Sequence, residues 1–321
     1  MKIDVHNHAF PQTVLELGEQ EPAFGISLEN GVLKRPNFTD RELEPSSYDG
    51  NAKLEELAER DLDGAVICLE PTVLSYHQPL ELGEAMCEAA NRGLRQMCEP
   101  DPTRLKWMAH VPLQDPERAA TVLRSAAADG AAGVQVGSSI EGRRLDERDF
   151  DPFWQAVDDT RLTVFVHNAY NPKVPGLQDY HLVNVIGNLL ETTICAERLV
   201  CAGTLDRHPT VRVVLAHGGG YFPYQAGRLR HAKTVRPELS DSPADPWDYA
   251  GRLIFDTITH DVQALAFLIS RAGADNVVVG TDLPYDMGTP RPMDDLVEAV
   301  GVETAAIVAE RNPERLYGFA A

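Results

Sequence analysis

The chain has 321 residues, of which 43% are hydrophobic and 24% charged, a composition typical of a globular protein with a substantial core. Its formal net charge of −20 argues against nucleic acid or an anionic membrane as partner. No segment reaches the roughly 18 apolar residues of a membrane span, and residues 1–5 lead into a strand rather than a signal peptide. The five cysteines form no Cys-x-x-Cys pair, so we expect reduced thiols in a cytoplasmic protein.

Short apolar segments bounded by glycine, proline or aspartate recur along the chain and predict eight strands. In chain order they are Lys2–Asn7, Ala65–Leu69, Leu105–Val111, Gly133–Val136, Leu162–Val166, Val211–Ala216, Arg252–Asp256 and Asn276–Gly280. Several of these segments are apolar without alternation, which is typical of parallel strands that helices cover on both faces.

Helical patterns fill the intervals between the strands. They predict helices at Lys53–Arg60, about Leu80–Met97 and about Leu182–Leu205, and Asp115 followed by Pro116 is typical of a helix start. Strands that alternate with helices predict an α/β fold, and eight of them predict a (β/α)8 or TIM barrel. An open doubly wound sheet is the alternative, but no Gly-x-Gly-x-x-Gly turn follows the first strand.

One long segment, Pro11–Asn51, reads as irregular and is rich in proline, glycine, asparagine and acidic residues. Because it follows the first strand, we expect it to emerge at the catalytic face as an inserted flap. No linker separates a second domain, so residues 1–321 are predicted to form one domain with 11–51 as its flap.

Five residues that can bind metal or carry protons end predicted strands. His6 and His8 close the first strand, where residues two apart point the same way. His167 ends the fifth strand, His217 the sixth and Asp282 the eighth. Barrel enzymes assemble their active sites at these carboxyl ends, and imidazoles with a carboxylate suit Zn, Mn, Fe or Co. One such residue alone is an ordinary polar strand end, but five together predict a metalloenzyme.

These residues resemble the amidohydrolase superfamily, in particular the branch that includes 2-amino-3-carboxymuconate 6-semialdehyde decarboxylase. The resemblance covers nearly the whole chain, and its most specific motifs are His-Gly-Gly-Gly at 217–220 and Gly-Thr-Asp at 280–282. It implies that the metal ligands are His6, His8, His167 and Asp282. It also implies that His217 is the acid or base beside the metal, so His217 and Asp282 are the expected catalytic residues.

The resemblance also bears on the number of metal ions. Binuclear members of the superfamily carry a bridging carboxylated lysine on the fourth strand, where this chain has Gln135. We therefore expect one divalent ion, with zinc ranked first and Mn, Fe or Co as alternatives.

Around the metal ligands the chain departs from this branch. Asn168 replaces a proline, His181 replaces an aromatic residue, and Tyr285 lies in Leu-Pro-Tyr-Asp where Tyr-Pro-Phe-Pro is usual. We expect these three residues to line a changed substrate wall, so the resemblance does not specify the substrate.

Arginines are the expected partners of a substrate carboxylate. Arg236 matches an arginine that reaches the substrate from the neighbouring subunit of the decarboxylase, which implies a homodimer or higher oligomer. The alternative is a solvated loop arginine. A second such arginine lies in the flap of these relatives, and here either Arg35 or Arg41 fits that description.

The leading prediction is non-oxidative decarboxylation of a small unsaturated or aromatic carboxylic acid, with His217 as the proton carrier. A metal ion lowers the pKa of bound water from 15.7 toward roughly 7, so the same residues would also serve a hydrolase of a C–C, ester or amide bond. A third reading, a non-catalytic barrel beside an active homologue, would have been favoured by the loss of a ligand or of His217.

Overall fold

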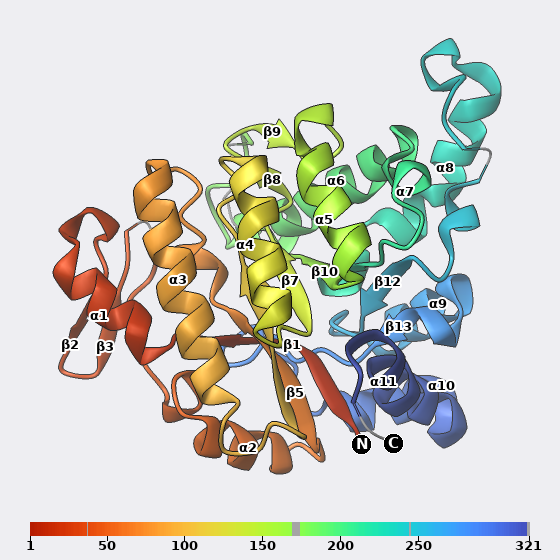
Figure 1. The fold of residues 1–321 in the computed structure, drawn as a ribbon. Helices are drawn as coiled ribbons and strands as arrows, with labels where there is room; N and C mark the ends of the chain where they lie inside the picture. The colour runs from red at the N-terminus through yellow and green to blue at the C-terminus, as the bar shows by residue number, and fades with distance from the viewer. Residues whose placement is uncertain (37, 169–173, 244, 320–321) are drawn as a thin grey trace.

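A computed structural model describes the chain at residues 1–36, 38–168, 174–243 and 245–319. Its centre is a sheet of eight parallel strands that lie in chain order (Figure 1). The strands are β1 (Ile3–Ala9), β5 (Gly64–Leu69), β6 (Leu105–His110), β7 (Gly133–Val136), β10 (Thr163–Val166), β11 (Val213–Leu215), β12 (Leu253–Asp256) and β13 (Val277–Val278). All eight predicted strands are present, and none of their ends differs from the predicted end by more than two residues.

The two edge strands of this sheet meet and form the barrel. The backbone N–H of Val5 donates to the carbonyl of Val279 at 2.8 Å, and that of His8 donates to the carbonyl of Leu283 at 2.7 Å. Asn7 also pairs with Leu283 in a parallel bridge. The predicted (β/α)8 barrel is therefore confirmed, and the ends of β1 and β13 lie side by side at its mouth.

Helices surround the strands (Figure 1). They are α2 (Gly50–Ala58), α3 (Leu80–Met97), α4 (Pro116–Ala128), α5 (Asp151–Thr160), α6 (Leu189–Cys201), α7 (Thr204–Arg207), α8 (Phe222–Val235), α9 (Val262–Ala272), α10 (Pro292–Ala306) and α11 (Asn312–Tyr317). The side chain of Asp115 accepts a hydrogen bond from the Arg118 N–H, which confirms the predicted start of α4.

The single helix predicted at about Leu182–Leu205 is wrong in its continuity. A π-helix at Val183–Asn188 precedes α6, and α7 begins after Gly203. Gly203 has φ of 62°, a left-handed conformation that ends a helix and that glycine adopts without a steric penalty.

The flap segment contains regular structure that its composition did not reveal. It begins with α1 (Gln12–Gln20), which packs against α3, and continues with a small antiparallel sheet. The strands of that sheet are β2 (Ser27–Glu29), β3 (Val32–Lys34) and β4 (Arg41–Glu42). Asn30 and Gly31 connect β2 to β3 with φ of 52° and 82°, as in a two-residue hairpin turn. A further short hairpin, β8 (Ser139–Ile140) and β9 (Arg143–Arg144), follows β7.

Inside the barrel, apolar side chains fill the space beneath the strand ends. This inner cluster includes Val5, Val66, Phe165 and Val214, all fully buried. The Phe165 ring lies 4.8 Å from the His6 ring, so the cluster forms the floor below the histidines. In the part of the chain that the structure describes, no helix combines the length and apolar character needed to cross a membrane.

Candidate metal centre

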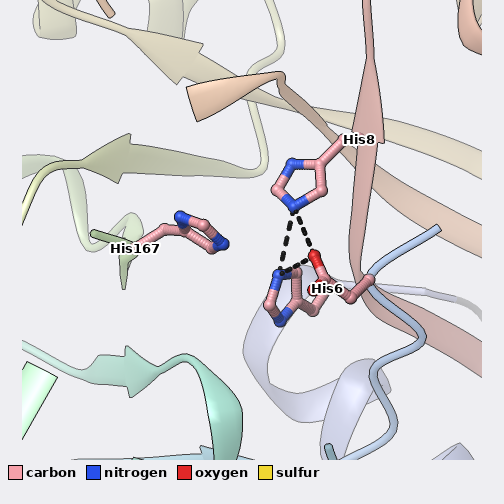
Figure 2. A group of neighbouring side chains, drawn as sticks. His6, His8 and His167 are labelled. Carbon is pink, nitrogen blue, oxygen red and sulfur yellow. Dashed lines mark hydrogen bonds and ion pairs between the residues drawn. The ribbon is translucent and has the colours of Figure 1, made fainter. Parts of the chain in front are cut away.

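Three histidines and an aspartate meet at the carboxyl ends of the strands, and Figure 2 shows the histidines, His6, His8 and His167. The potential ligand atoms of His6, His8, His167 and Asp282 lie within 4.8 Å of one another, and all four residues are buried. His8 Nε2 is 2.9 Å from Asp282 Oδ1, and His6 Nε2 is 3.2 Å from the same oxygen. Residues distant in the sequence thus form one compact set because β1, β10 and β13 end at the same rim.

The charge states of the four side chains suit a metal ion. Burial lowers the pKa of His8 to about 4, and burial with neighbouring imidazoles holds the pKa of His167 well below its ordinary value. Both rings are therefore neutral at pH 7 and offer nitrogen lone pairs. Burial alone would raise the pKa of Asp282, but His6 and hydrogen bonds from the histidines hold it well below its usual range. Neutral imidazoles and a carboxylate are the forms that ligate a metal.

His6 carries the compensating charge. Burial alone would lower the pKa of His6, but Asp282 and the hydrogen bond to Asp256 outweigh it and raise the pKa to about 10. A cation bound at this point would take the place of the proton on His6.

His167 gives a direct test of whether these residues fit a metal. Its Nδ1 lies 2.9 Å from the carbonyl oxygen of Asn168, which leaves the lone pair on Nε2. Nε2 is buried and has no hydrogen-bond partner within the described ranges. An unpaired buried nitrogen costs about 1–3 kcal/mol. A divalent ion among nitrogen and oxygen ligands would satisfy it, so the residues present fit such an ion.

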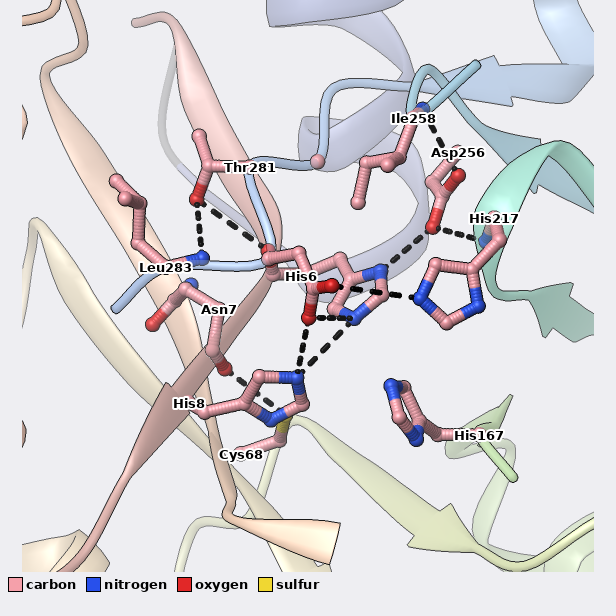
Figure 3. Close-up of polar contacts among 12 residues, drawn as sticks. His6, Asn7, His8, Cys68, His167, His217, Asp256, Ile258, Thr281 and Leu283 are labelled. Atoms are coloured by element: carbon pink, nitrogen blue, oxygen red, sulfur yellow. Dashed lines mark hydrogen bonds and ion pairs between the residues drawn. The ribbon is translucent and has the colours of Figure 1, made fainter. Parts of the chain in front are cut away.

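Asp256, which our sequence analysis did not single out, contacts both His6 and His217 through its carboxylate (Figure 3). Its Oδ2 accepts hydrogen bonds from His6 Nδ1 at 2.6 Å and from the backbone N–H of His217 at 2.8 Å. Its Oδ1 accepts from the N–H groups of Gly218 at 2.7 Å and Ile258 at 3.0 Å. A carboxylate behind a metal-binding imidazole fixes the orientation of the ring. The signal was present, because Asp256 ends a predicted strand as the other site residues do.

His217 lies beside the ligand set (Figure 3). Its Nε2 is 3.4 Å from Asp282 Oδ2, and its Nδ1 is buried with no hydrogen-bond partner among the residues described. His217 and Asp282 have φ of 56° and 60°, which is uncommon for residues with a Cβ and occurs at functional sites. Gly220 maintains the turn after His217, since a Cβ there would lie 2.2 Å from the Leu189 carbonyl oxygen.

Two further side chains flank His8. The Tyr285 ring lies 5.2 Å from the His8 ring, and its hydroxyl is buried without a partner among the described residues. On the other side, Cys68 Sγ is 3.3 Å from His8 Nδ1 and donates to the carbonyl of Asn7. Tyr285 thus lies at the edge of the site, where a residue of the substrate wall would be.

The other predicted substrate-binding residues lie at different depths. Asn168 is buried next to His167, accepting from Ser138 Oγ at 3.1 Å and donating to Asn188 Oδ1 at 2.8 Å. His181 is exposed just before the π-helix. Arg236 ends α8 with 62% of its side chain exposed and forms an ion pair with Glu238 at 2.8 Å. Within the described part of this one chain, neither His181 nor Arg236 contacts the four candidate ligands.

The flap arginines converge on a buried carboxylate. Glu70 directly follows β5, and its side chain is fully buried. Arg35 forms an ion pair with Oε1 of Glu70, and Arg41 forms one with Oε2 at 2.5 Å. The Arg41 guanidinium lies 6.0 Å from the ring centroid of Tyr285, so this cluster adjoins the wall of the site.

Known proteins share this fold and sequence pattern. A family model described as Amidohydrolase matches residues 3–319. A 2-amino-3-carboxymuconate-6-semialdehyde decarboxylase of Dictyostelium discoideum is 28% identical over 327 residues, which cover 99% of this chain and 89% of that protein. The crystal structure of 5-carboxyvanillate decarboxylase from Sphingomonas paucimobilis matches with a TM-score of 0.85 and 20% identity, covering 99% of each chain. A dihydroxybenzoic acid decarboxylase from Polaromonas, with bound manganese and the inhibitor 2-nitroresorcinol, matches with a TM-score of 0.79 and 20% identity over 99% of this chain and 96% of that one.

Proposed function

Because the chain belongs to the amidohydrolase family and is an enzyme of that family, we propose that it is a metal-dependent non-oxidative decarboxylase. Its substrate in this proposal is a small aromatic or unsaturated carboxylic acid. The observation that carries the proposal is the convergence of His6, His8, His167 and Asp282 next to His217. The names of the similar proteins support the reaction class, since each of the three is a decarboxylase.

The proposed cofactor is one divalent ion held by His6, His8, His167 and Asp282. Ligand chemistry ranks zinc first, but the manganese in the similar Polaromonas structure favours Mn²⁺. Gln135 supports a single ion. It occupies the place on β7 where a binuclear site would need a lysine, and its side chain instead donates to the carbonyl of Leu69 at 2.9 Å. When bound, such an ion supplies Lewis-acid polarisation of a substrate oxygen.

The remaining chemistry falls to the side chains of this chain. Decarboxylation breaks the bond between the carboxylate carbon and its neighbour, leaves the electron pair on that neighbour, and requires a proton there. His217 is the proposed proton donor, since an imidazole at the edge of the ligand set can reach a substrate bound beside it. Asp282 Oδ2 lies 3.4 Å from His217 Nε2, and Asp256 Oδ2 accepts a hydrogen bond from the His217 backbone N–H.

The substrate wall and the assembly are parts of the same proposal. Asn168 and Tyr285 would line the wall beside His167 and His8, and a flap arginine would bind an anionic group of the substrate. Arg236 would reach the site of a partner subunit in a homodimer, which its exposure at the end of α8 permits. His181, which is also exposed, would face substrate only in such an assembly.

Two broader expectations complete the proposal. Residues 1–321 would act as one domain with 11–51 as a flap over the barrel mouth, as the contact between Arg41 and Glu70 supports. A cytoplasmic location is proposed because the five cysteines are all unpaired.

The test is a search for released CO2. Protein loaded with Mn²⁺ or Zn²⁺ would be offered aromatic acids, including 2,6-dihydroxybenzoate and 5-carboxyvanillate, together with a matched panel of aryl esters and amides. We expect CO2 from at least one acid, loss of that activity with a chelator, and recovery with metal. Cleavage of esters or amides without CO2 release from any acid would contradict the proposal and support the hydrolase alternative.

A further inference from the structure

We propose that Thr193, on α6, is a positioning residue for His217. In this role its hydroxyl holds the end of the glycine turn that follows His217, and so keeps the imidazole beside the candidate metal ligands. The inference rests on the proposed function, in which His217 is the proton donor. It assigns a role to a residue that lies outside the ligand set.

The turn at residues 217–220 has an unusual backbone conformation. His217 and the three glycines after it all have positive φ, between 56° and 74°. Within the turn, the N–H of Gly219 donates to the carbonyl of Ala216 at 3.1 Å, and that of Gly220 donates to the carbonyl of His217 at 3.0 Å. A left-handed conformation is unfavourable for a residue with a Cβ, such as His217, so contacts from outside the turn must hold it.

Two side chains hold the turn at its two ends. At the start, the Asp256 carboxylate accepts from the N–H groups of His217 and Gly218, at 2.8 and 2.7 Å. At the end, Thr193 Oγ1 accepts from the N–H of Tyr221 at 2.7 Å. His217 therefore lies between two fixed points. Asp256 also binds the ring of a candidate ligand, whereas Thr193 acts on the turn alone.

The Thr193 hydroxyl is itself fixed by α6. It donates to the carbonyl of Leu189, one helical turn earlier, at 2.7 Å, so it acts both as donor and as acceptor. A Cβ on Gly220 would lie 2.2 Å from that carbonyl oxygen and 2.7 Å from Thr193 Oγ1, so the turn packs closely on α6. Because Thr193 is buried, loss of its hydroxyl would leave the Tyr221 N–H without this acceptor.

The start of α6 is bound to the barrel, which makes the helix a fixed frame for the turn. Asn188, the residue before α6, accepts from Asn168 Nδ2 at 2.8 Å, and Asn168 directly follows the candidate ligand His167. The Tyr221 hydroxyl also donates to the carbonyl of Ile186 at 3.3 Å, in the π-helix before α6. One helical segment thus connects the end of β10 to the turn after β11, and sets His217 relative to His167.

The sequence of α8 offers no substitute for the bond from Thr193. Tyr221 is the N-cap of α8, and its side chain makes no capping hydrogen bond. In a capping box, the third residue of the helix binds the backbone N–H of the N-cap. In α8 that residue is Tyr224, whose side chain is 77% exposed. Thr193 binds this N–H from another helix instead.

Histidine-selective NMR on the Zn²⁺-loaded protein tests the inference without turnover. With carbon-13-labelled histidine, each ring gives one Hε1–Cε1 signal, and that of His217 is identified by its absence in His217→Asn. Thr193→Val and Thr193→Ala both remove the hydroxyl, so both should displace or broaden the His217 signal. The signals of His6, His8 and His167 should stay in place. Thr193→Ser, which restores the hydroxyl, should return the wild-type spectrum.

Kinetics and amide exchange give two further readouts. In Thr193→Val the kcat on the first substrate found should fall by up to about a hundredfold, the effect of misplacing a reacting group by about 1 Å. KM and metal content should stay unchanged, because the ligands and the substrate wall are left intact. Hydrogen exchange at the Tyr221 amide should become about tenfold faster, as expected for the loss of one hydrogen bond.

Thr192→Val is the matched control. Thr192 is the neighbour of Thr193 on α6, is fully buried, and donates in the same way to the carbonyl of Asn188, at 3.1 Å. Its hydroxyl bonds to its own helix, whereas that of Thr193 also reaches the turn. Thr192→Val should therefore leave the His217 signal, the exchange rate of the Tyr221 amide and kcat unchanged. If Thr193→Val does not fold, Thr193→Ala, which adds no methyl group at the turn, decides.

Four results would overturn the inference: an unmoved His217 signal in the variants that lack the Thr193 hydroxyl, an equal displacement in Thr192→Val, an equal displacement of the ligand histidines, or no recovery in Thr193→Ser. A protein that releases no CO2 from any acid would overturn the proposed reaction instead. The two failures are distinguishable, because the NMR and exchange measurements do not depend on turnover.

Discussion

Asp256 connects the candidate metal ligands to the proposed proton donor. One oxygen of its carboxylate binds both the His6 ring and the backbone of His217, and the other binds two more backbone N–H groups. Burial alone would raise the pKa of Asp256, but the hydrogen bond from His6 and the nearby histidine charges keep it below its ordinary value. The residue is therefore an anion that accepts from four donors, a role that a neutral amide does not reproduce.

Replacing this carboxylate should weaken metal binding. In Asp256→Asn the amide NH2 group would face at least one of the N–H donors, so His6 would lose its fixed orientation. We expect a 10–100-fold loss of Mn²⁺ affinity, the usual effect of removing a partner behind a metal ligand. Competition with a fluorescent chelator measures it. The control is Asp146→Asn, because the Asp146 carboxylate accepts two hydrogen bonds from Arg198, at 2.7 and 2.9 Å, and is not among the candidate ligands. Unchanged affinity would show that Asp256 serves only the backbone turn.

His217 should behave differently from the four ligands. Because its ring lies outside the compact ligand set, His217→Asn should retain the metal and bind substrate with similar affinity. Its kcat should fall by about 10²–10⁴-fold, the usual contribution of a general acid or base. Elemental analysis and steady-state kinetics on the first substrate found give both quantities. Loss of the metal together with activity would make His217 a ligand instead.

At the scale of elements, the strands were predictable and the flap was not. The barrel strands are buried on both faces, so their apolar composition reports them directly, whereas the strands of the flap have two or three residues and leave little pattern. Most of the site followed from the same rule, because His167 directly follows β10 and Asp282 lies in the segment just after β13. Glu70 and Asp256 occupy equivalent positions, but one acidic residue after a strand is not distinctive until its partners are known.

The features that the sequence did not predict depend on contacts between residues that are far apart in the chain. Nothing in the sequence indicates that Arg35 and Arg41 share the carboxylate of Glu70, since they lie 35 and 29 residues from it in the chain. In the same way, the exposure of Arg236 depends on how α8 leaves the barrel.

The position of His6 depends on close packing between β1 and the segment after β13, which contains Gly280. A Cβ at this position would lie 2.8 Å from His6 Cβ and 3.1 Å from Asp256 Cβ. Gly280→Ala should therefore displace His6 and lower Mn²⁺ affinity. Its effect on the free energy of Mn²⁺ binding should exceed its effect on the free energy of unfolding. The control is Gly227→Ala in α8, where a Cβ meets nothing within 4 Å. That change should leave metal binding intact and raise helix stability by about 0.5–1 kcal/mol. Equal metal affinity in the two variants would contradict this account of the packing.

At the scale of the whole molecule, the net charge and the position of Arg236 after α8 bear on how a substrate is captured. With a net charge of −20, the protein must attract an anionic substrate through local groups, because its overall field opposes approach. The helix α8 projects from the barrel (Figure 1). Arg236 directly follows α8, and 62% of its side chain is exposed, as its proposed role in a partner subunit requires.

Mixed dimers test this assembly. Chains carrying His217→Ala and chains carrying Arg236→Ala should each be inactive alone. Mixed after unfolding and refolding, they should recover part of the wild-type activity, because a hybrid dimer contains one site with both residues intact. Activity is measured alongside native mass spectrometry, which establishes that hybrids have formed. If demonstrated hybrids stay inactive, Arg236 acts within its own loop or not at all.

The number of metal ions per chain tests the central claim most directly. Elemental analysis of the purified protein should find about one divalent ion per chain. His6→Ala and Asp282→Ala should each lose that ion while circular dichroism shows the barrel still folded. Two tightly bound ions per chain, or an ion retained in both variants, would contradict the assignment of His6, His8, His167 and Asp282 as the ligands of a single metal.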